Sequence, residues 1–258
     1  MATRHSDRHT RSYLFVFGLS RSGTTALVRL LTGHGDIALG MERFKRLWTP
    51  ERIKHLTSEL FTATRFFDFA DGLTNITPDA GPGWAAYYEK LREKYDEARY
   101  VGDKAGRLWL DVLQRSFPES KVVCVVRNVF DTAHSWQARA DDSADVNWPS
   151  ERGARAAVAH WNRALERVHD AQVKHPDSVR TLEYQSFFGA EDEKPLLAVL
   201  DFLGLPWDAN VEAAWSDCRR TYRHRVVRKS RVLDEADRLF IDENADWGLW
   251  DRVRALAI

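Results

Sequence analysis

The chain has 258 residues, a length that suits one α/β domain with a sizeable core. Its 38 basic and 38 acidic side chains balance, so no overall field draws it to nucleic acid or to an acidic membrane surface. The two cysteines, Cys124 and Cys218, form no disulfide framework and favour a reducing compartment. Because no apolar stretch is long enough to span a bilayer and the N-terminus lacks a signal-like apolar region, we expect a cytoplasmic protein without a membrane span.

Residues 1–12 alternate Arg, His, Ser and Thr without periodicity and are expected to form a flexible arm ahead of a single domain over 13–258. The apolar run Tyr13–Phe17 is rich in β-formers and predicts a buried strand. A short loop bounded by glycines follows, and Thr24–Leu31 has the apolar spacing of a helix. This strand, loop and helix form a cradle for an anion, because backbone N–H groups and the helix dipole point to one place. It predicts an α/β fold with a P-loop-like central parallel sheet flanked by helices.

The loop departs from the nucleoside-triphosphate pattern G-x-x-x-x-G-K-[ST] at one decisive position. Gly18 and Gly23 have the required spacing, but Thr24 stands where the lysine should be, and the one cation in the loop is Arg21. Without that lysine the leaving group lacks its main counter-charge, which argues against NTP hydrolysis. Hydroxyl groups in its place suit a smaller or less charged end group.

The octet Gly18–Thr25, GLSRSGTT, resembles the 5′-phosphosulfate loop of sulfotransferases that use 3′-phosphoadenosine 5′-phosphosulfate (PAPS). The resemblance implies that this loop holds the 5′ end of the donor through Arg21, Ser22, Gly23, Thr24 and Thr25.

A second extended segment, Ile37–Leu39, is followed by Glu42. In tyrosylprotein sulfotransferases and similar bacterial enzymes a Glu at the matching distance is the general base, so Glu42 inherits that role. The alternative is a surface carboxylate paired with Arg43 or Lys45.

Thr49–Phe69 and Trp84–Tyr95 are expected to be helices separated by a loop. The strand over 100–106 leads to a helix over 107–117. Its Gly102-Asp103-Lys104 resembles the G-D-K element of the same enzymes, in which the Lys contacts the transferring group. Lys104 inherits that role, and the alternative is a solvated Lys at a helix start.

A second motif is R-N-x-x-D-x-x-x-S, which follows the β-branched run Val122–Val126. This run is typical of a central parallel strand, and Phe130–Gln137 reads as the next helix. Arg127 at the strand's carboxyl end and Ser135 on the helix can converge on one phosphate. The string matches the 3′-phosphate motif of PAPS enzymes, whereas Asp131 is expected to brace the helix N-terminus.

The remaining chain adds expected helices over 151–174, 195–204 and 246–253 and a strand over 179–182. Residues 219–231 form a basic block, which is usually a solvated face or a nucleic-acid patch. Relatives place a loop that closes over the nucleotide here, so Arg223, Lys229 and Ser230 are candidates for holding the donor.

The sequence therefore predicts transfer of a sulfuryl group from PAPS to an acceptor hydroxyl, leaving adenosine 3′,5′-bisphosphate. Glu42 takes the proton, while Arg21 and Lys104 offset developing charge and replace a metal ion. Arg127 and Ser135 hold the 3′-phosphate. A P-loop kinase and a non-catalytic PAPS-binding protein are the alternatives. The acceptor (small molecule, glycan, lipid, phenol or peptide tyrosine) and a homodimer are left open.

Overall fold

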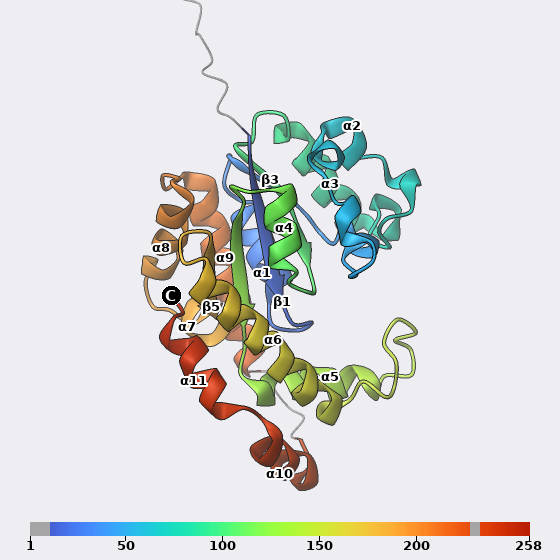
Figure 1. The fold of residues 1–258 in the computed structure, drawn as a ribbon, viewed down its shortest axis with the longest axis vertical. Coiled ribbons are helices and arrows are strands. Elements are labelled where there is room, and N and C mark those ends of the chain that lie inside the picture. Colours follow the sequence, from blue (N-terminus) through green and yellow to red (C-terminus); the bar gives the residue numbers. More distant parts are fainter. Residues whose placement is uncertain (1–10, 228–232) are drawn as a thin grey trace, which may run out of the picture.

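The computed structural model describes residues 11–227 and 233–258 (Figure 1). At its centre is a five-stranded, all-parallel sheet with the order β2-β3-β1-β4-β5. The predicted α/β fold with a central parallel sheet is confirmed. The strands are β1 (Ser12–Gly18), β2 (Ile37–Gly40), β3 (Tyr100–Ala105), β4 (Lys121–Val126) and β5 (Val179–Glu183).

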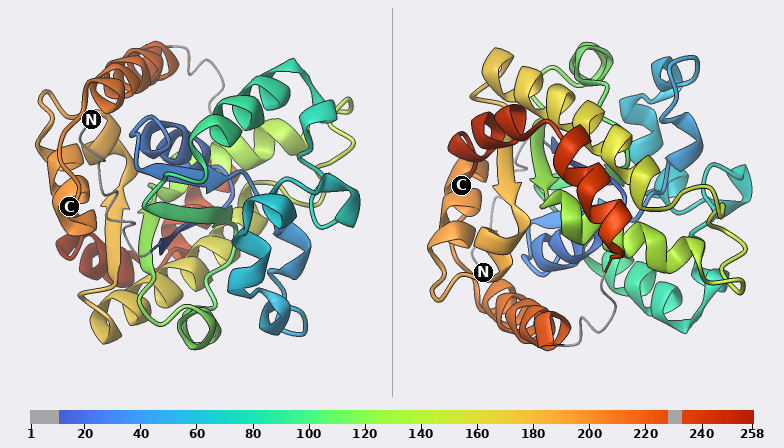
Figure 2. Two further views of the ribbon diagram at one scale, coloured as in Figure 1. Left: turned by 90° about the horizontal axis from the view of Figure 1, so that it is seen from above. Right: turned by 90° about the horizontal axis from the view of Figure 1, so that it is seen from below.

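Helices cover both faces of the sheet (Figure 2), because alternate residues of the strands face two separate apolar cores. Leu14 and Val16 of β1 face one core, whereas Phe15 and Phe17 face the other. The first core is closed by α1 (Thr24–Leu31), α7 (Tyr184–Phe188), α8 (Lys194–Leu203) and α9 (Ala209–Val227).

The second core is larger and contains the buried Cys124. It packs against the segment between β2 and β3. The short helices of this segment lie on one side of the molecule (upper right of Figure 1). The helices that contribute to it are α2 (Ala63–Phe66), α3 (Pro82–Lys94), α4 (Leu110–Ser116), α5 (Val129–Ala140), α6 (Ala154–Lys174), α10 (Glu235–Asn244) and α11 (Trp247–Ala255).

The single helix expected over 49–69 is wrong. This stretch is a series of short turns, η2 (Ile53–His55), η3 (Ser58–Phe61) and α2, with η1 (Lys45–Leu47) before it and η4 (Phe69–Asp71) and η5 (Pro78–Ala80) after it. Arg43 holds the end of this stretch. Its fully buried guanidinium donates from Nε to the Phe66 carbonyl (2.6 Å) and from Nη2 to the Asp68 carbonyl (2.7 Å). These bonds fix the chain in the turns that follow α2, where a longer helix would have to continue.

Three other expectations change at their boundaries. The arm expected over 1–12 overlaps the fold, because Ser12 opens β1 and Arg11 donates to the carbonyl oxygens of Phe61 and Tyr95. The helix after β3 begins at Leu110 rather than 107. The basic block is the end of α9 as far as Val227, not a loop up to that point, while Lys229 and Ser230 lie outside the described residues.

In the described ranges, 11–227 and 233–258, no helix combines the length and apolar character needed to cross a membrane.

Candidate active site

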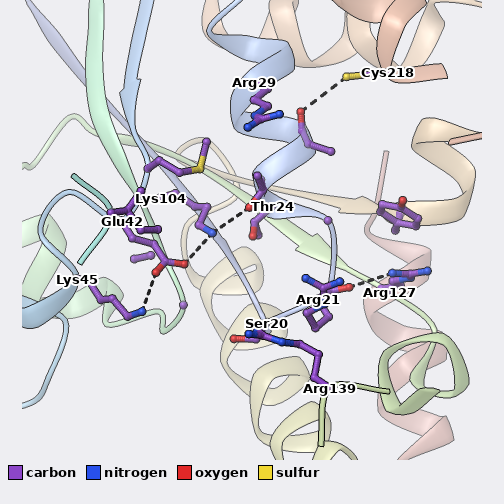
Figure 3. A pocket seen from close by; sticks show the side chains of 18 of the residues that line it. Ser20, Arg21, Thr24, Arg29, Glu42, Lys45, Lys104, Arg127, Arg139 and Cys218 are labelled. Atoms are coloured by element: carbon purple, nitrogen blue, oxygen red, sulfur yellow. Dashed lines mark hydrogen bonds and ion pairs between the residues drawn. The ribbon is translucent and has the colours of Figure 1, made fainter. Parts of the chain in front are cut away.

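A cleft of about 1010 Å³ opens where β1, β3 and β4 end (Figure 3). This edge, at the carboxyl ends of parallel strands, is where open α/β sheets bind ligands. The cleft brings together most of the residues that the sequence singled out, from segments far apart in the chain. The predicted residues that line it are Arg21, Gly23, Thr24, Thr25, Glu42, Lys104 and Arg127.

The loop within Gly18–Thr25, here called the anion loop, joins β1 to α1. Its glycines are packed too closely to their neighbours for larger residues to replace them. A Cβ on Gly18 would lie 2.5 Å from Ser22 Oγ and 2.7 Å from the Val125 carbonyl oxygen. Gly23 has φ 104°, a left-handed conformation that favours glycine. The amides of Thr24 and Thr25 at the start of α1 have no intrahelical acceptor, since the Gly23 carbonyl accepts from Ala26 and Leu27, and they are available to an anion in the cleft. Ser22 itself is buried in the wall and does not line the cleft.

Glu42 lies between two ammonium groups at the end of β2 (Figure 3). Its Oε1 is 2.8 Å from Lys104 Nζ and its Oε2 is 3.1 Å from Lys45 Nζ. Burial opposes ionisation of Glu42, but Lys104 and Lys45 outweigh it and hold the pKa of this carboxyl below its usual value. The carboxylate is therefore charged at neutral pH. The pairing with Lys45 that the sequence offered as an alternative exists, whereas Arg43 points away into the core and pairs with Asp71.

Lys104 joins this carboxylate to the anion loop. It lies on β3 with 7% exposure, so the alternative of a solvated Lys at a helix start is wrong. Besides Glu42, its ammonium group donates to Thr25 Oγ1 (3.2 Å). One buried cation thus connects the expected base with the expected phosphosulfate loop.

Arg127 and Ser135 meet at Arg21. Arg127 Nη1 donates to the Arg21 carbonyl oxygen (3.0 Å), and Arg21 Nε donates to Ser135 Oγ (2.9 Å). The Arg127 guanidinium also lies 4.4 Å from the ring centroid of Tyr184 and 3.6 Å from Asp131 Oδ2. Arg127 and Ser135 thus both contact Arg21, but Ser135 is not among the residues that line the cleft. That the two bind one phosphate stays a prediction.

The basic block contributes differently from the prediction. Cys218, Thr221 and Tyr222 line the cleft because residues three and four apart share one face of α9. Arg223 lies on the exposed part of this helix and is not a lining residue.

The sequence alone does not indicate which cations and aromatic rings lie at the two ends of the cleft. Arg29 comes one helical turn after Thr25, so the period of α1 was a usable signal for it. Its guanidinium lies 5.6 Å from the ring centroid of Trp84, which comes from α3. On the other side, Arg139 lies 4.5 Å from the ring centroid of Trp148. No local pattern marks these tertiary pairs.

Among the residues that the structure describes, no group of three or more His, Cys, Asp or Glu side chains is arranged to hold a metal ion.

Comparisons with known proteins find relatives of this chain. A family model described as "Sulfotransferase family" matches residues 14–209. Protein-tyrosine sulfotransferase 1 of Danio rerio is 26% identical over 198 residues, which cover 76% of this chain and 54% of the relative. Protein-tyrosine sulfotransferase 2 of Gallus gallus is 27% identical over 202 residues, with 77% and 52% covered. The chain thus spans about half the length of these relatives.

Solved structures share the fold. The sulfotransferase domain of the Synechococcus PCC 7002 olefin synthase superposes with a TM-score of 0.53 at 16% identity, covering 96% of both chains. The sulfotransferase STF1 of Mycobacterium tuberculosis H37Rv gives a TM-score of 0.51 at 18% identity, covering 97% of this chain and 78% of its own. With the family model matching most of the length, the chain belongs to the sulfotransferase family.

Proposed function

We propose that the protein transfers a sulfuryl group from PAPS to a hydroxyl group of an acceptor. The observation that carries the proposal is the position of Lys104. Its ammonium group lies 2.8 Å from Glu42 Oε1 and 3.2 Å from Thr25 Oγ1. A base for the acceptor and a loop for the donor are therefore within reach of one cation, as an in-line transfer between them requires.

The donor side of the cleft fits PAPS by its chemistry. The amides and hydroxyls of Thr24 and Thr25 would hold the 5′-phosphosulfate, since the start of α1 favours an anion. Arg127, with a planar guanidinium, would hold the 3′-phosphate, and Ser135 would support it through Arg21. An ordinary nucleoside triphosphate lacks a 3′-phosphate and would lose this contact.

In the reaction, the acceptor oxygen forms a bond to sulfur while the bond between sulfur and the 5′-phosphate oxygen breaks. Glu42 accepts the hydroxyl proton, and its depressed pKa keeps it ionised and ready to do so. The electron pair of the broken bond stays on adenosine 3′,5′-bisphosphate. Lys104 and Arg21 offset the negative charge that builds up on the transferring group and the leaving oxygen.

The acceptor is a hydroxyl-bearing molecule that reaches Glu42. The cleft that contains this residue is also lined by Met41, Ile76 and Trp84 and by the cations Arg29 and Lys45. Because the curated relatives are named protein-tyrosine sulfotransferases, a peptide tyrosine is the first acceptor to test. Phenols, alcohols, glycans and lipids follow.

The test combines binding and turnover. In calorimetric titrations we expect adenosine 3′,5′-bisphosphate to bind more tightly than Mg·ATP, and ³⁵S-labelled PAPS to label at least one acceptor of the panel. Preference for Mg·ATP would indicate the kinase alternative instead. Uptake of PAPS without transfer to any acceptor would indicate a non-catalytic binder.

A further inference from the structure

A buried carboxylate that the proposed mechanism does not use lies directly beside the Glu42–Lys104 pair. Asp103 precedes Lys104 on β3 and has no exposed surface. Its Oδ1 accepts the backbone N–H groups of Arg43 and Lys104, both at 2.9 Å, and its Oδ2 accepts that of Phe44 at 2.8 Å. Both oxygens therefore bind the backbone immediately after Glu42, and Oδ1 also binds the backbone of Lys104.

This contact matters because the backbone at Glu42 is strained. Glu42 has φ 58°, in the left-handed region that costs free energy for any residue other than glycine. Such a conformation persists only where its surroundings impose it. The hydrogen bonds from Arg43 and Phe44 to Asp103 are a direct cause, since they fix the chain on the carboxyl side of the strained residue.

The fit around the carboxylate is tight. A Cβ on Gly40 would lie 2.7 Å from Asp103 Oδ1 and 2.9 Å from Arg43 Cβ, so glycine is needed for this approach. The Arg43 guanidinium does not neutralise Asp103, because it pairs with Asp71. Burial accordingly raises the pKa of Asp103 to about 6, against the three N–H groups that favour its charged form. A carboxylate kept at such a cost in desolvation indicates a specific task.

We infer that Asp103 is a positioning residue that holds Glu42 against Lys104 by fixing the backbone of residues 43 and 44. Its kinetic consequence rests on the proposed function, because it assumes that Glu42 is the base. Its structural consequence, a close Glu42–Lys104 pair, does not depend on any reaction.

The chain offers a matched control at the other end of β2, the strand that Arg43 and Phe44 follow. Asp208 also bridges two segments with both oxygens, accepting from Val211 N–H at 2.7 Å and from Gly35 N–H at 3.0 Å. Gly35 precedes β2, whereas Arg43 and Phe44 follow it. Asp208 does not line the cleft. Asp103→Asn and Asp208→Asn therefore remove the same kind of acceptor at opposite ends of β2.

The kinetic experiment compares these two variants with a working acceptor. We expect both to lower the melting temperature, but only Asp103→Asn to lower kcat, by roughly tenfold to a hundredfold, because small displacements of a catalytic group are costly. Affinity for adenosine 3′,5′-bisphosphate should stay within about twofold, since Asp103 does not line the cleft. In a Glu42→Ala background, Asp103→Asn should cost no further activity, because the two changes act through one group.

A second readout needs no turnover. The titration of the Glu42 carboxyl, followed by ¹³C NMR, should move to higher pH in Asp103→Asn as the Lys104 pair loosens. Loss of the negative charge of Asp103, which repels Glu42, acts in the opposite direction, so a rise reports the loosened pair. If the wild type transfers no sulfuryl group, the proposed function fails and this titration still decides the inference. Should Asp103→Asn not fold, Gly40→Ala displaces the same carboxylate and takes its place. A folded variant with wild-type kcat or unshifted Glu42, or an equal loss of kcat in Asp208→Asn, overturns the inference.

Discussion

Glu42 and Arg21 share an unusual backbone. Among the described residues other than glycine, these are the ones with positive φ, at 58° and 76°, and both line the cleft. Each such conformation costs about 1–2 kcal/mol, which the surrounding packing must supply. The two side chains from which we expect proton transfer and charge stabilisation are thus directed by strained turns at the ends of β2 and β1.

Glu42→Gln should lower kcat by roughly 10²- to 10⁴-fold, because the amide keeps the shape of the side chain but cannot accept the acceptor's proton. PAPS affinity should change little. Initial rates and calorimetry measure the two effects separately. Glu59→Gln, which changes an exposed carboxylate outside the cleft, is the control. A Glu42→Gln enzyme with normal turnover would remove the base assignment.

The protonation of Glu42 should depend on Lys104. In the wild type the carboxyl titrates below its ordinary value, since Lys104 and Lys45 outweigh burial. In Lys104→Met burial opposes only the weaker Lys45 pair, so the midpoint should rise. As pH falls, the variant therefore protonates its base earlier than the wild type does. A ¹³C NMR titration of the Glu42 carboxyl checks the direction, and an unchanged midpoint would contradict it.

Arg127→Ala should weaken binding of adenosine 3′,5′-bisphosphate by roughly tenfold or more, the usual loss for a charge-assisted hydrogen bond. Adenosine 5′-phosphosulfate, which has no 3′-phosphate, should lose much less. Calorimetry with both ligands gives the comparison, and Arg238→Ala on the exposed side of α10 serves as the control. Equal losses for the two ligands would place Arg127 elsewhere on the nucleotide.

At the scale of elements, the anion loop depends on one glycine at its junction with α1. An alanine at Gly23 would place its Cβ 2.3 Å from Tyr184 and strain a backbone with φ 104°. Gly23→Ala should therefore lower nucleotide affinity by at least roughly tenfold while the chain stays folded. Gly83→Ala, in α3 with nothing within 4 Å of the added carbon, is the matched control in calorimetry. Equal affinity in both variants would show that the loop tolerates the change.

The local sequence predicted the strands correctly but predicted the structure of one long segment wrongly. The apolar runs of β1 and β4 predicted their strands because a parallel strand is buried on both faces. The segment 49–69 has helix-compatible residues, but Arg43 binds the carbonyl groups of residues 65, 66 and 68 at its end. The sequence offered Arg43 or Lys45 as a surface partner of Glu42 only as an alternative to the base role, and nothing local shows that the partner of Arg43 is Asp71.

The candidate site likewise contains residues that the sequence predicted and residues that it did not. Glu42 and Arg127 follow strand ends, and Lys104 is the last residue but one of β3. Parallel strands bring such positions to one edge, so their gathering in one cleft was predictable. The roles assigned to them stay predictions until the experiments above are done. Trp84 and Arg139 enter the cleft from α3 and α5, and their approach depends on tertiary packing that no spacing in the chain encodes.

At the scale of the molecule, we expect the larger core to determine stability and the cleft to determine nucleotide affinity. Phe61 lies in the larger core, where its ring is 5.0 Å from Phe44, 5.6 Å from Phe117 and 5.8 Å from Phe15 between centroids. Phe61→Ala should lower the free energy of unfolding by about 3–5 kcal/mol, as measured by urea denaturation. Nucleotide affinity of the folded variant should be unchanged, and a loss of affinity would show that this core shapes the cleft.

The order of strands in the sheet also bears on how the chain is made. β1 pairs with β3 and β4, so both neighbours of the first strand are synthesised only after residue 99. Until β3 and β4 leave the ribosome, the apolar stretch 13–17 has no strand to pair with, and it stays exposed unless other contacts cover it temporarily. The anion loop attached to it is therefore synthesised before the strands that complete its sheet, and conditions that slow translation between residues 40 and 120 should increase aggregation of the nascent protein.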